Sequence, residues 1–163
     1  MDVRVAREMD LPAMLAIYND EVAQGVATFD TVPREGEVAR AWFEGHNRDN
    51  HPLLVAERDG EVAGYASLST YNPKAAYTST VELSVYVANT HRRQGEARSL
   101  MDAILQSARE DPVTHLVVSL ITCGNEASVR LHEEFGFACV GTLHEVGCKF
   151  GRLLDVDFYE LQV

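Results

Sequence analysis

The chain has 163 residues, of which 46% are hydrophobic and 24% charged, so it is long and apolar enough for one domain with a sizeable core. Its formal net charge of −11 opposes binding to a nucleic-acid backbone, which needs a broad basic surface. No apolar run approaches the roughly 20 residues of a membrane span, and the N-terminal residues lack the apolar stretch of a secretory signal. We therefore expect residues 1–163 to form a single cytoplasmic domain that binds neither nucleic acid nor membrane.

The first predicted elements are a strand and two helices. Residues 3–8 alternate between apolar and polar side chains like a strand. Asp10 then caps a predicted helix that has Pro12 in its first turn, and a second helix ends near Gly45. The apolar stripe of the first helix comprises Leu11, Leu15, Tyr18 and Val22.

A β-hairpin is the strongest local signal. Residues 53–68 contain two β-rich runs joined by Asp59-Gly60, a dipeptide that readily supplies the positive φ angles of a tight turn. A loop at 71–78 and a strand at 79–88 follow.

The rest of the chain alternates between helices and strands: a turn at 91–98, a helix at 99–111, a strand at 114–122, a short helix at 125–137, and two strands around Gly151. This order predicts an α+β fold in which helices cover a mixed sheet.

The turn before the third helix concentrates basic residues in an acidic protein. Backbone N–H groups at a helix N-terminus are unpaired and attract anions. Gly95 allows close approach of the backbone, Ala97 keeps bulk away, and Arg93 and Arg98 can reach around a diphosphate, while Glu96 is expected to point to solvent. The alternative is a solvated loop followed by a helix with arginines on its exposed face.

Residues 92–97, Arg-Arg-Gln-Gly-Glu-Ala, resemble the [QR]-x-x-G-x-[GA] acetyl-CoA signature of the GNAT N-acetyltransferase superfamily. A narrower resemblance, to the phosphinothricin/methionine sulfoximine acetyltransferase family, spans almost the whole chain. It rests on IYNDEVAQGVATFDTVP, TVELSVYV, GNEASVRLHEEFGF and EVGCKFGRLLDV. The resemblance implies the GNAT-type fold, a mostly antiparallel mixed sheet flanked by helices, and a homodimer.

The resemblance also implies how acetyl-CoA binds as co-substrate. The pantetheine arm lies along the strand at Val85, Tyr86 and Val87, and the pyrophosphate lies on the turn formed by Arg93, Gln94, Gly95, Glu96, Ala97 and Arg98. Asn125 matches an asparagine that holds the pantetheine arm in relatives, and its alternative role is an ordinary helix N-cap.

Two residues match the family's catalytic positions. Acetyl transfer needs an amine without its extra proton, donors for the developing oxyanion and a proton for the leaving thiolate. Glu82 stands where relatives carry the catalytic glutamate, although on pattern alone it could be a solvent-facing residue of an alternating strand. The backbone N–H groups of Val85 and Tyr86 are the expected oxyanion donors.

His132 is the second catalytic residue that the resemblance implies. It is either the general acid for the CoA sulfur or the partner of Glu82 in a dyad, and the sequence does not choose between them. The other histidines are read as surface or packing residues: His46, His51, His91, His115 and His144.

The three cysteines are odd in number and lack CxxC spacing. We therefore expect reduced thiols, no disulfide framework and no metal site. Because none of them is a recognisable nucleophile, we expect direct transfer without an acetyl-enzyme.

The implied acceptor is a small amino-acid-like amine. Phe29 and Phe150 match aromatic positions that wall the acceptor site, or are simply core residues. The loop that binds the acceptor's carboxylate in relatives contains Asn72, Lys74 and Tyr77. Lys74 pairs with a carboxylate only as a point charge, because it lacks the bidentate fork of arginine. The chain departs from the family's common pattern at Asn72, Thr78, Leu83 and Leu153.

Other functions use parts of the same machinery. A polyamine, an aminoglycoside or a protein N-terminus could replace the amino-acid-like acceptor. A non-catalytic CoA-binding regulator would need the turn around Gly95 but neither Glu82 nor His132.

Overall fold

The computed structural model describes residues 1–163 and contains one seven-stranded sheet in the order β1-β2-β3-β4-β5-β7-β6. Its strands are β1 Asp2–Val5, β2 Leu53–Arg58, β3 Glu61–Thr70, β4 Thr80–Val87, β5 Leu116–Thr122, β6 Ala138–Lys149 and β7 Arg152–Gln162. Its α-helices are α1 Leu11–Gln24, α2 Gly36–Glu44, α3 Glu96–Glu110 and α4 Glu126–Glu134. Only β4 and β5 pair in parallel. The predicted mixed, mostly antiparallel α+β fold is therefore confirmed.

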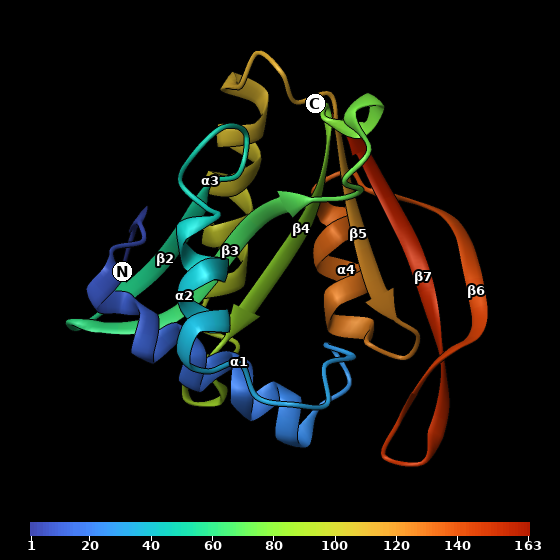
Figure 1. Cartoon of the computed structure of the whole chain (residues 1–163), viewed down its shortest axis with the longest axis horizontal. Coiled ribbons are helices and arrows are strands. Elements are labelled where there is room, and N and C mark those ends of the chain that lie inside the picture. Colours follow the sequence, from blue (N-terminus) through green and yellow to red (C-terminus); the bar gives the residue numbers. More distant parts are fainter.

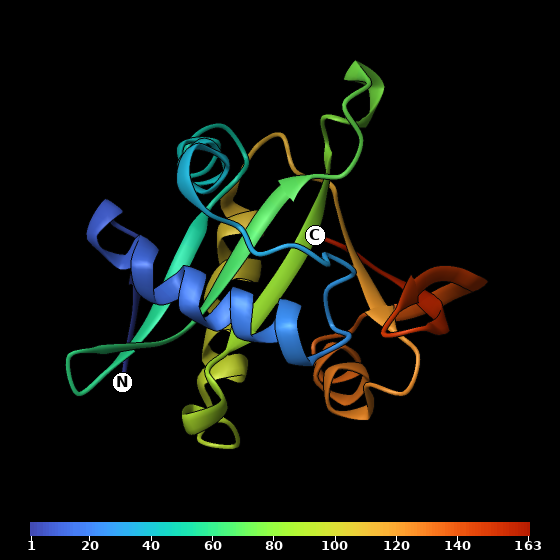
Figure 2. The ribbon, with the colours of Figure 1, turned by 60° about the horizontal axis from the view of Figure 1, so that its bottom comes forward.

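Helices cover both faces of the sheet (Figures 1 and 2). The larger core cluster lies between the sheet and α3, whose Leu100 and Ile104 pack with Val81 of β4. The smaller cluster lies under α1, where Met14 packs near Tyr65 of β3. None of the helices combines the length and the hydropathy that crossing a membrane requires.

Local predictions were confirmed to different degrees. Asp59 and Gly60 have φ angles of 53° and 84°, as the hairpin turn requires. The buried stripe of α1 is Met14, Tyr18 and Val22, and the half-buried Leu11 packs against the same cluster. The predicted stripe was therefore wrong only at Leu15, which is half-buried and lies outside that cluster.

Asp10 does not cap α1 with its side chain. Its carboxylate instead accepts hydrogen bonds from the Arg4 guanidinium at 2.7 and 2.9 Å and from the backbone N–H of Arg7 at 2.7 Å. These contacts tie β1 to the entrance of α1. The Asp10 carboxylate was predicted to cap the N-terminus of α1, but it binds the Arg4 guanidinium of β1 because hydrogen bonds between charged groups are stronger.

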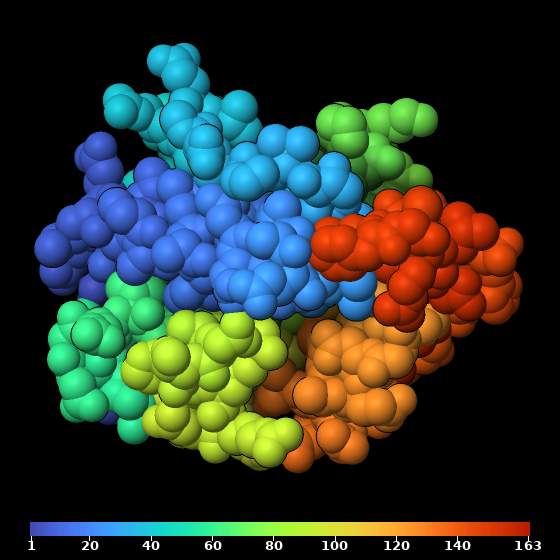
Figure 3. All heavy atoms as spheres, turned by 90° about the horizontal axis from the view of Figure 1, so that it is seen from below, coloured from blue at the N-terminus to red at the C-terminus, as the bar shows by residue number.

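A split in the sheet is the feature that shapes the site. β4 and β5 pair only from Thr80↔Leu116 to Glu82↔Val118, and beyond that point the two strands diverge, as Figure 1 shows. Seen from below, Figure 3 shows a hollow between the segment that follows β4 and the segment that contains α4. The strand edges that face the split lack a neighbouring strand, so their backbone groups are available to a ligand.

Candidate active site

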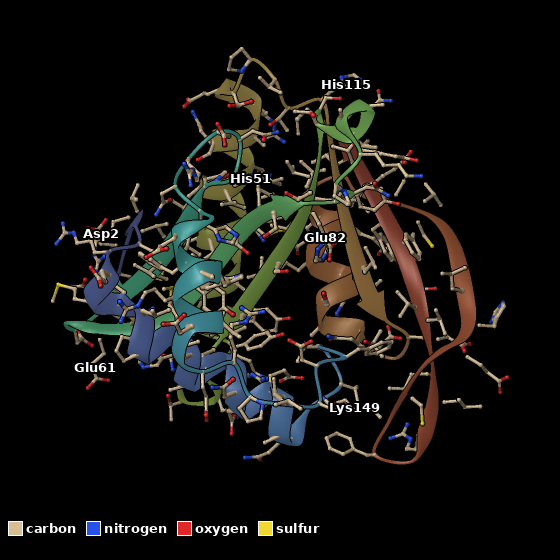
Figure 4. All side chains as sticks on the ribbon, in the orientation of Figure 1. Asp2, His51, Glu61, Glu82, His115 and Lys149 are labelled. Atoms are coloured by element: carbon tan, nitrogen blue, oxygen red, sulfur yellow. The ribbon has the colours of Figure 1, made fainter.

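Glu82 lies where the split begins. Successive side chains of a strand point to opposite faces, and Val81 and Leu83 belong to the cluster that α3 covers. Glu82 therefore points to the face covered by α1 and α2 (Figure 4). It is half-buried, and this burial raises the pKa of its carboxyl group above the ordinary value. No hydrogen bond from another side chain holds the carboxylate, which leaves it available to a ligand.

The backbone of β4 presents alternate residues to the split. The N–H of Ala88 donates to the carbonyl of Ala63 at 2.9 Å, so the backbone groups of Ala88 face β3. By alternation, those of Tyr86 also face β3, and those of Val85 and Val87 face the split. Of the two expected oxyanion donors, only the N–H of Val85 has the required direction.

The basic turn has the geometry of an anion site. Gly95 precedes α3 with a φ of 99°, in the left-handed region that favours glycine, and Arg93 has a φ of 62°. Arg93 is exposed, and its side chain makes no hydrogen bond within the chain. Arg98 is also exposed, and it pairs with Glu134 of α4 at 2.6 Å. The first N–H groups of α3 are thus open to an anion between two arginines.

Glu96 does not point to solvent, so that expectation was wrong. Its side chain is 1% exposed, and Oε1 accepts a hydrogen bond from Nε of Arg58 at 2.7 Å. Arg58 also donates to the backbone carbonyl of Gln94 at 3.2 Å. Oε2 of Glu96 is buried without a partner. Arg58 therefore links the β2–β3 hairpin to the turn through two hydrogen bonds. No local sequence pattern predicts this contact.

Asn125 caps α4. Its side-chain oxygen accepts a hydrogen bond from the backbone N–H of Ser128 at 3.2 Å, so the N-cap role is confirmed. This bond uses the oxygen alone, and the side-chain amide makes no hydrogen bond within the chain. Asn125 could therefore still donate to a ligand.

His132 is 4% exposed, and burial lowers its pKa. Nδ1 lies 2.8 Å from the carbonyl oxygen of Ser128, which can only accept, so Nδ1 carries the proton. Nε2 is buried without a partner. The neutral ring therefore presents a lone pair at Nε2.

Glu82 and His132 do not form a hydrogen-bonded dyad. The imidazole packs edge-on against Phe137 at 5.0 Å between ring centroids, and Phe137 belongs to the cluster under α3. Glu82 points to the opposite face of the sheet. The sequence left two roles open for His132: general acid for the CoA sulfur, or partner of Glu82 in a dyad. This structure does not contain the direct pairing with Glu82.

The expected acceptor residues fall into two groups. Asn72, Lys74 and Tyr77 lie on the loop that joins β3 to β4, at the end of β4 where Glu82 stands. Lys74 is exposed and its ammonium group has no partner within the chain, while Tyr77 packs edge-on against Tyr71 at 5.8 Å.

The two phenylalanines lie farther from this loop in sequence and position. Phe29 packs against the backbone of Gly147 in β6 and is half-buried. Phe150 is 56% exposed at the tip of the β6–β7 hairpin, and its neighbour Lys149 is well separated from Glu82 in Figure 4. Within one chain, Phe150 therefore does not join the loop around Lys74.

The segment between α1 and α2, which contains Phe29, is hydrogen-bonded to the strands on the β5 side of the split. Lys149 donates to the carbonyl of Thr28 at 2.8 Å, and the hydroxyl of Thr122 donates to the carbonyl of Val26 at 2.6 Å. The segment crosses the sheet in Figure 2 and so covers the face to which Glu82 points.

Two residues near the β3–β4 strand pair were not predicted to belong to the site: Ser69 was not singled out, and His46 was expected to be a surface or packing residue. Ser69 of β3 is the direct cross-strand partner of Glu82, and Nε2 of His46 lies 2.8 Å from its hydroxyl. The hairpin register could have placed Ser69. His46 follows α2, and only the packing of that helix brings it to the strand.

Comparison with known proteins identifies the family. Residues 3–157 match the model described as the acetyltransferase (GNAT) domain. The chain is 40% identical to the L-methionine sulfoximine/L-methionine sulfone acetyltransferase of Pseudomonas paraeruginosa, over 99% of this chain and 94% of that protein. It is 41% identical to the phosphinothricin N-acetyltransferase of Alcaligenes faecalis, over 94% of this chain and 78% of that protein.

A solved structure agrees with the fold. The putative acetyltransferase yncA from Salmonella typhimurium, solved with acetyl-CoA, superposes with a TM-score of 0.95 at 36% identity, covering 99% of this chain and 93% of that one. The sequence comparisons and the superposition identify the same family. The split sheet and the glycine turn before α3 are consistent with it. The chain belongs to the GNAT family of N-acetyltransferases.

Proposed function

We propose that this enzyme transfers the acetyl group of acetyl-CoA directly to the primary amine of a small amino-acid-like acceptor of the phosphinothricin, methionine sulfoximine or methionine sulfone type. One observation carries the proposal: Glu82 is a half-buried carboxylate with a raised pKa and no side-chain partner, at the point where the sheet splits. A base with a pKa nearer neutrality is suited to take a proton from an ammonium group. The names of the relatives supply the acceptor class.

The residues around the split suit acetyl-CoA. Val85 and Val87 have backbone groups free to pair with the pantetheine amides, as an added strand would. The pyrophosphate would lie on the turn from Arg93 to Arg98, with Asn125 donating its amide to the pantetheine arm. The reaction needs no metal ion, and residues 1–163 act as one domain in the cytoplasm.

Each protein group then has a defined task. Acetyl-CoA supplies the acetyl group as an activated thioester. Glu82 accepts the ammonium proton, directly or through a water, so that the free amine attacks the thioester carbon. The N–H of Val85 stabilises the oxyanion, and collapse breaks the carbon–sulfur bond. The attacking nitrogen is cationic after attack and releases a proton to become the amide. His132, whose Nε2 has a free lone pair, starts neutral, so it acts as the acid for the thiolate only after it gains a proton, and the proton released by the nitrogen balances this gain.

The acceptor's carboxylate would lie near Lys74, with Asn72 and Tyr77 on the same loop and Phe29 on the opposite wall. Lys74 is exposed, so its contribution as a point charge is small. Phe150 reaches this region only if the hairpin of a second subunit approaches it.

The surface of β6 supports a homodimer. This edge strand is exposed along nearly its whole length. Its exposed apolar side chains, with their fractional exposures, are Val140 (56%), Leu143 (48%) and Val146 (51%). An unprotected apolar edge strand favours pairing with another chain. Light scattering should give twice the monomer mass, and Leu143→Glu should shift the protein to monomer; a monomeric wild type at micromolar concentration would contradict this assembly.

The activity can be tested by following thiol release from acetyl-CoA. We would compare phosphinothricin, methionine sulfoximine, methionine sulfone, spermidine and an aminoglycoside, using wild type, Glu82→Gln and the control Glu61→Gln. Glu61 is exposed at the β2–β3 hairpin, far from Glu82 in Figure 4. We expect release with the first three acceptors, a decrease of about 10² to 10⁴ for Glu82→Gln, and no change for the control.

Other outcomes have clear meanings. Thiol release with spermidine or the aminoglycoside alone would contradict the amino-acid-like acceptor, but the proposed acetyl transfer to an amine would stand. Cofactor binding without turnover of any amine would favour a CoA-binding regulator. Acetate trapped on Cys148, detected by mass spectrometry, would contradict direct transfer.

A further inference from the structure

A polar strip lies beside Glu82 on the same face of the sheet. Directly opposed residues of antiparallel strands share a face, and β3 and β4 pair Ser67 with Ser84 and Ser69 with Glu82. The Cβ atoms of such pairs lie about 4.5–5.5 Å apart. The Ser69 hydroxyl is therefore a close side-chain neighbour of the carboxylate proposed as the base.

His46 determines what the Ser69 hydroxyl can do. Nδ1 of His46 lies 2.7 Å from the carbonyl oxygen of Trp42, which only accepts, so Nδ1 carries the proton of the neutral ring. Burial lowers the pKa of His46 and favours this neutral form. Nε2 must then accept, and the Ser69 hydroxyl donates its proton to it across 2.8 Å.

The oxygen of Ser69 is consequently left with lone pairs only. An acceptor amine arriving beside Glu82 brings two or three N–H donors, of which the carboxylate takes one or two. We propose that His46 and Ser69 form a positioning pair that holds the acceptor's amine against Glu82, with the Ser69 oxygen as its second hydrogen-bond acceptor. This inference rests on the proposed function of Glu82 as the base for an amine.

The pair has a structural alternative. His46 packs against the Trp42 ring at 4.8 Å between ring centroids, so it could serve only to hold the end of α2 against the sheet. In that case, changes at His46 would affect stability, and their effect would not depend on Ser69. A positioning role instead predicts that the effects of changing His46 and Ser69 on the acceptor KM are coupled. It also predicts that the acetyl-CoA KM does not change.

The test compares steady-state constants for wild type, Ser69→Ala, Ser69→Thr, His46→Phe, His46→Gln and the double variant Ser69→Ala/His46→Phe. Thr70→Ala is the matched control, because Thr70 is the next residue of β3 and points to the other face. Thermal midpoints would identify any unfolded variant. Ser69→Ala keeps the test valid if His46→Phe does not fold, because it removes only a hydroxyl.

We expect Ser69→Ala to raise the acceptor KM roughly tenfold, the effect of one lost hydrogen bond to a charged group, and to leave the acetyl-CoA KM unchanged. Ser69→Thr should retain most of the affinity because it keeps the hydroxyl. His46→Gln should keep part of it, because the amide oxygen can still accept from Ser69. His46→Phe should raise the acceptor KM in wild type but not in Ser69→Ala.

An unchanged acceptor KM in Ser69→Ala, or an equal effect of His46→Phe in both backgrounds, would overturn the positioning pair. If Glu82→Gln still lowered thiol release by about 10² to 10⁴ in the acceptor comparison described above, the proposed function would stand. Full activity of Glu82→Gln, or no turnover of any amine by wild type, would instead remove the proposed function and this inference with it.

Discussion

The cofactor side and the acceptor side of Glu82 are built in different ways. The proposed cofactor side comes mainly from one continuous segment, from β4 through the turn at Gly95 into α3, and it offers chiefly backbone groups to the ligand. The proposed acceptor side gathers side chains from the segment after α2, from β3 and from two loops. A site made of backbone depends on a short conformational motif, whereas a site made of distant side chains depends on packing.

The Arg58–Glu96 pair offers the strongest test of how much the cofactor side depends on residues outside its own segment. Arg58→Met leaves a nearly fully buried carboxylate unpaired at the N-terminus of α3, where it would repel a diphosphate. Removing one partner of a buried pair costs about 3–5 kcal/mol, although the partial exposure of Arg58 places the expected loss at the lower end. We expect a lower thermal midpoint and an acetyl-CoA KM at least about tenfold higher.

The double variant Arg58→Met/Glu96→Leu provides the control. It removes the unpaired charge as well, so we expect the acetyl-CoA KM to return toward the wild-type value. An Arg58→Met variant with normal stability and normal acetyl-CoA KM would show that the turn does not need the hairpin.

The pH dependence of kcat/KM compares Glu82 with an ordinary glutamate. The active form is the carboxylate, and burial raises its pKa above the ordinary 4.5, so protonation inactivates the enzyme at a higher pH than for an exposed glutamate. Activity should fall about tenfold per pH unit below that raised pKa. The fall should disappear in Glu82→Gln, whose low residual rate should not depend on this ionisation. Circular dichroism at each pH would exclude unfolding, and a fall that persists in Glu82→Gln would assign the ionisation to another group.

Asn125 allows its two roles to be separated. Asn125→Ala should cost about 1 kcal/mol of stability through loss of the N-cap. Asn125→Asp keeps a capping oxygen and loses the amide donor, so it should retain stability while raising the acetyl-CoA KM a few-fold. Chemical denaturation and acetyl-CoA kinetics check the two effects, and an unchanged KM in Asn125→Asp would leave the residue as a cap only.

Lys74 should have the smallest effect. Its ammonium group is exposed and pairs with a carboxylate only as a screened point charge. We expect Lys74→Ala to raise the acceptor KM about two- to fivefold at low salt and less at high salt. An acceptor KM equal to wild type at low salt would place the carboxylate elsewhere.

Several features followed from local sequence. The Asp59-Gly60 hairpin, the turn with Gly95 and the order of elements depend on backbone conformation and hydrophobic period, which short stretches encode. The direction of Glu82 also follows from strand alternation once Val81 and Leu83 are recognised as core.

Other features depended on side-chain partners from other elements of the fold. Glu96 was expected to point to solvent, yet Arg58 reaches it from a hairpin 38 residues earlier. Asp10 was expected to cap a helix, and Arg4 of β1 binds it instead. Ionic contacts of this kind follow from packing, which a local pattern does not encode.

By itself, the sequence determined the family, the α+β order and the segment proposed to bind the cofactor, because each depends on contiguous residues and their backbone geometry. Only the tertiary structure decided that Glu82 and His132 stand on opposite faces, that Glu96 is buried against Arg58, and that His46 reaches Ser69, the cross-strand neighbour of Glu82. These relations depend on strand register and on how helices cross the sheet, which are set by the packing of the whole chain.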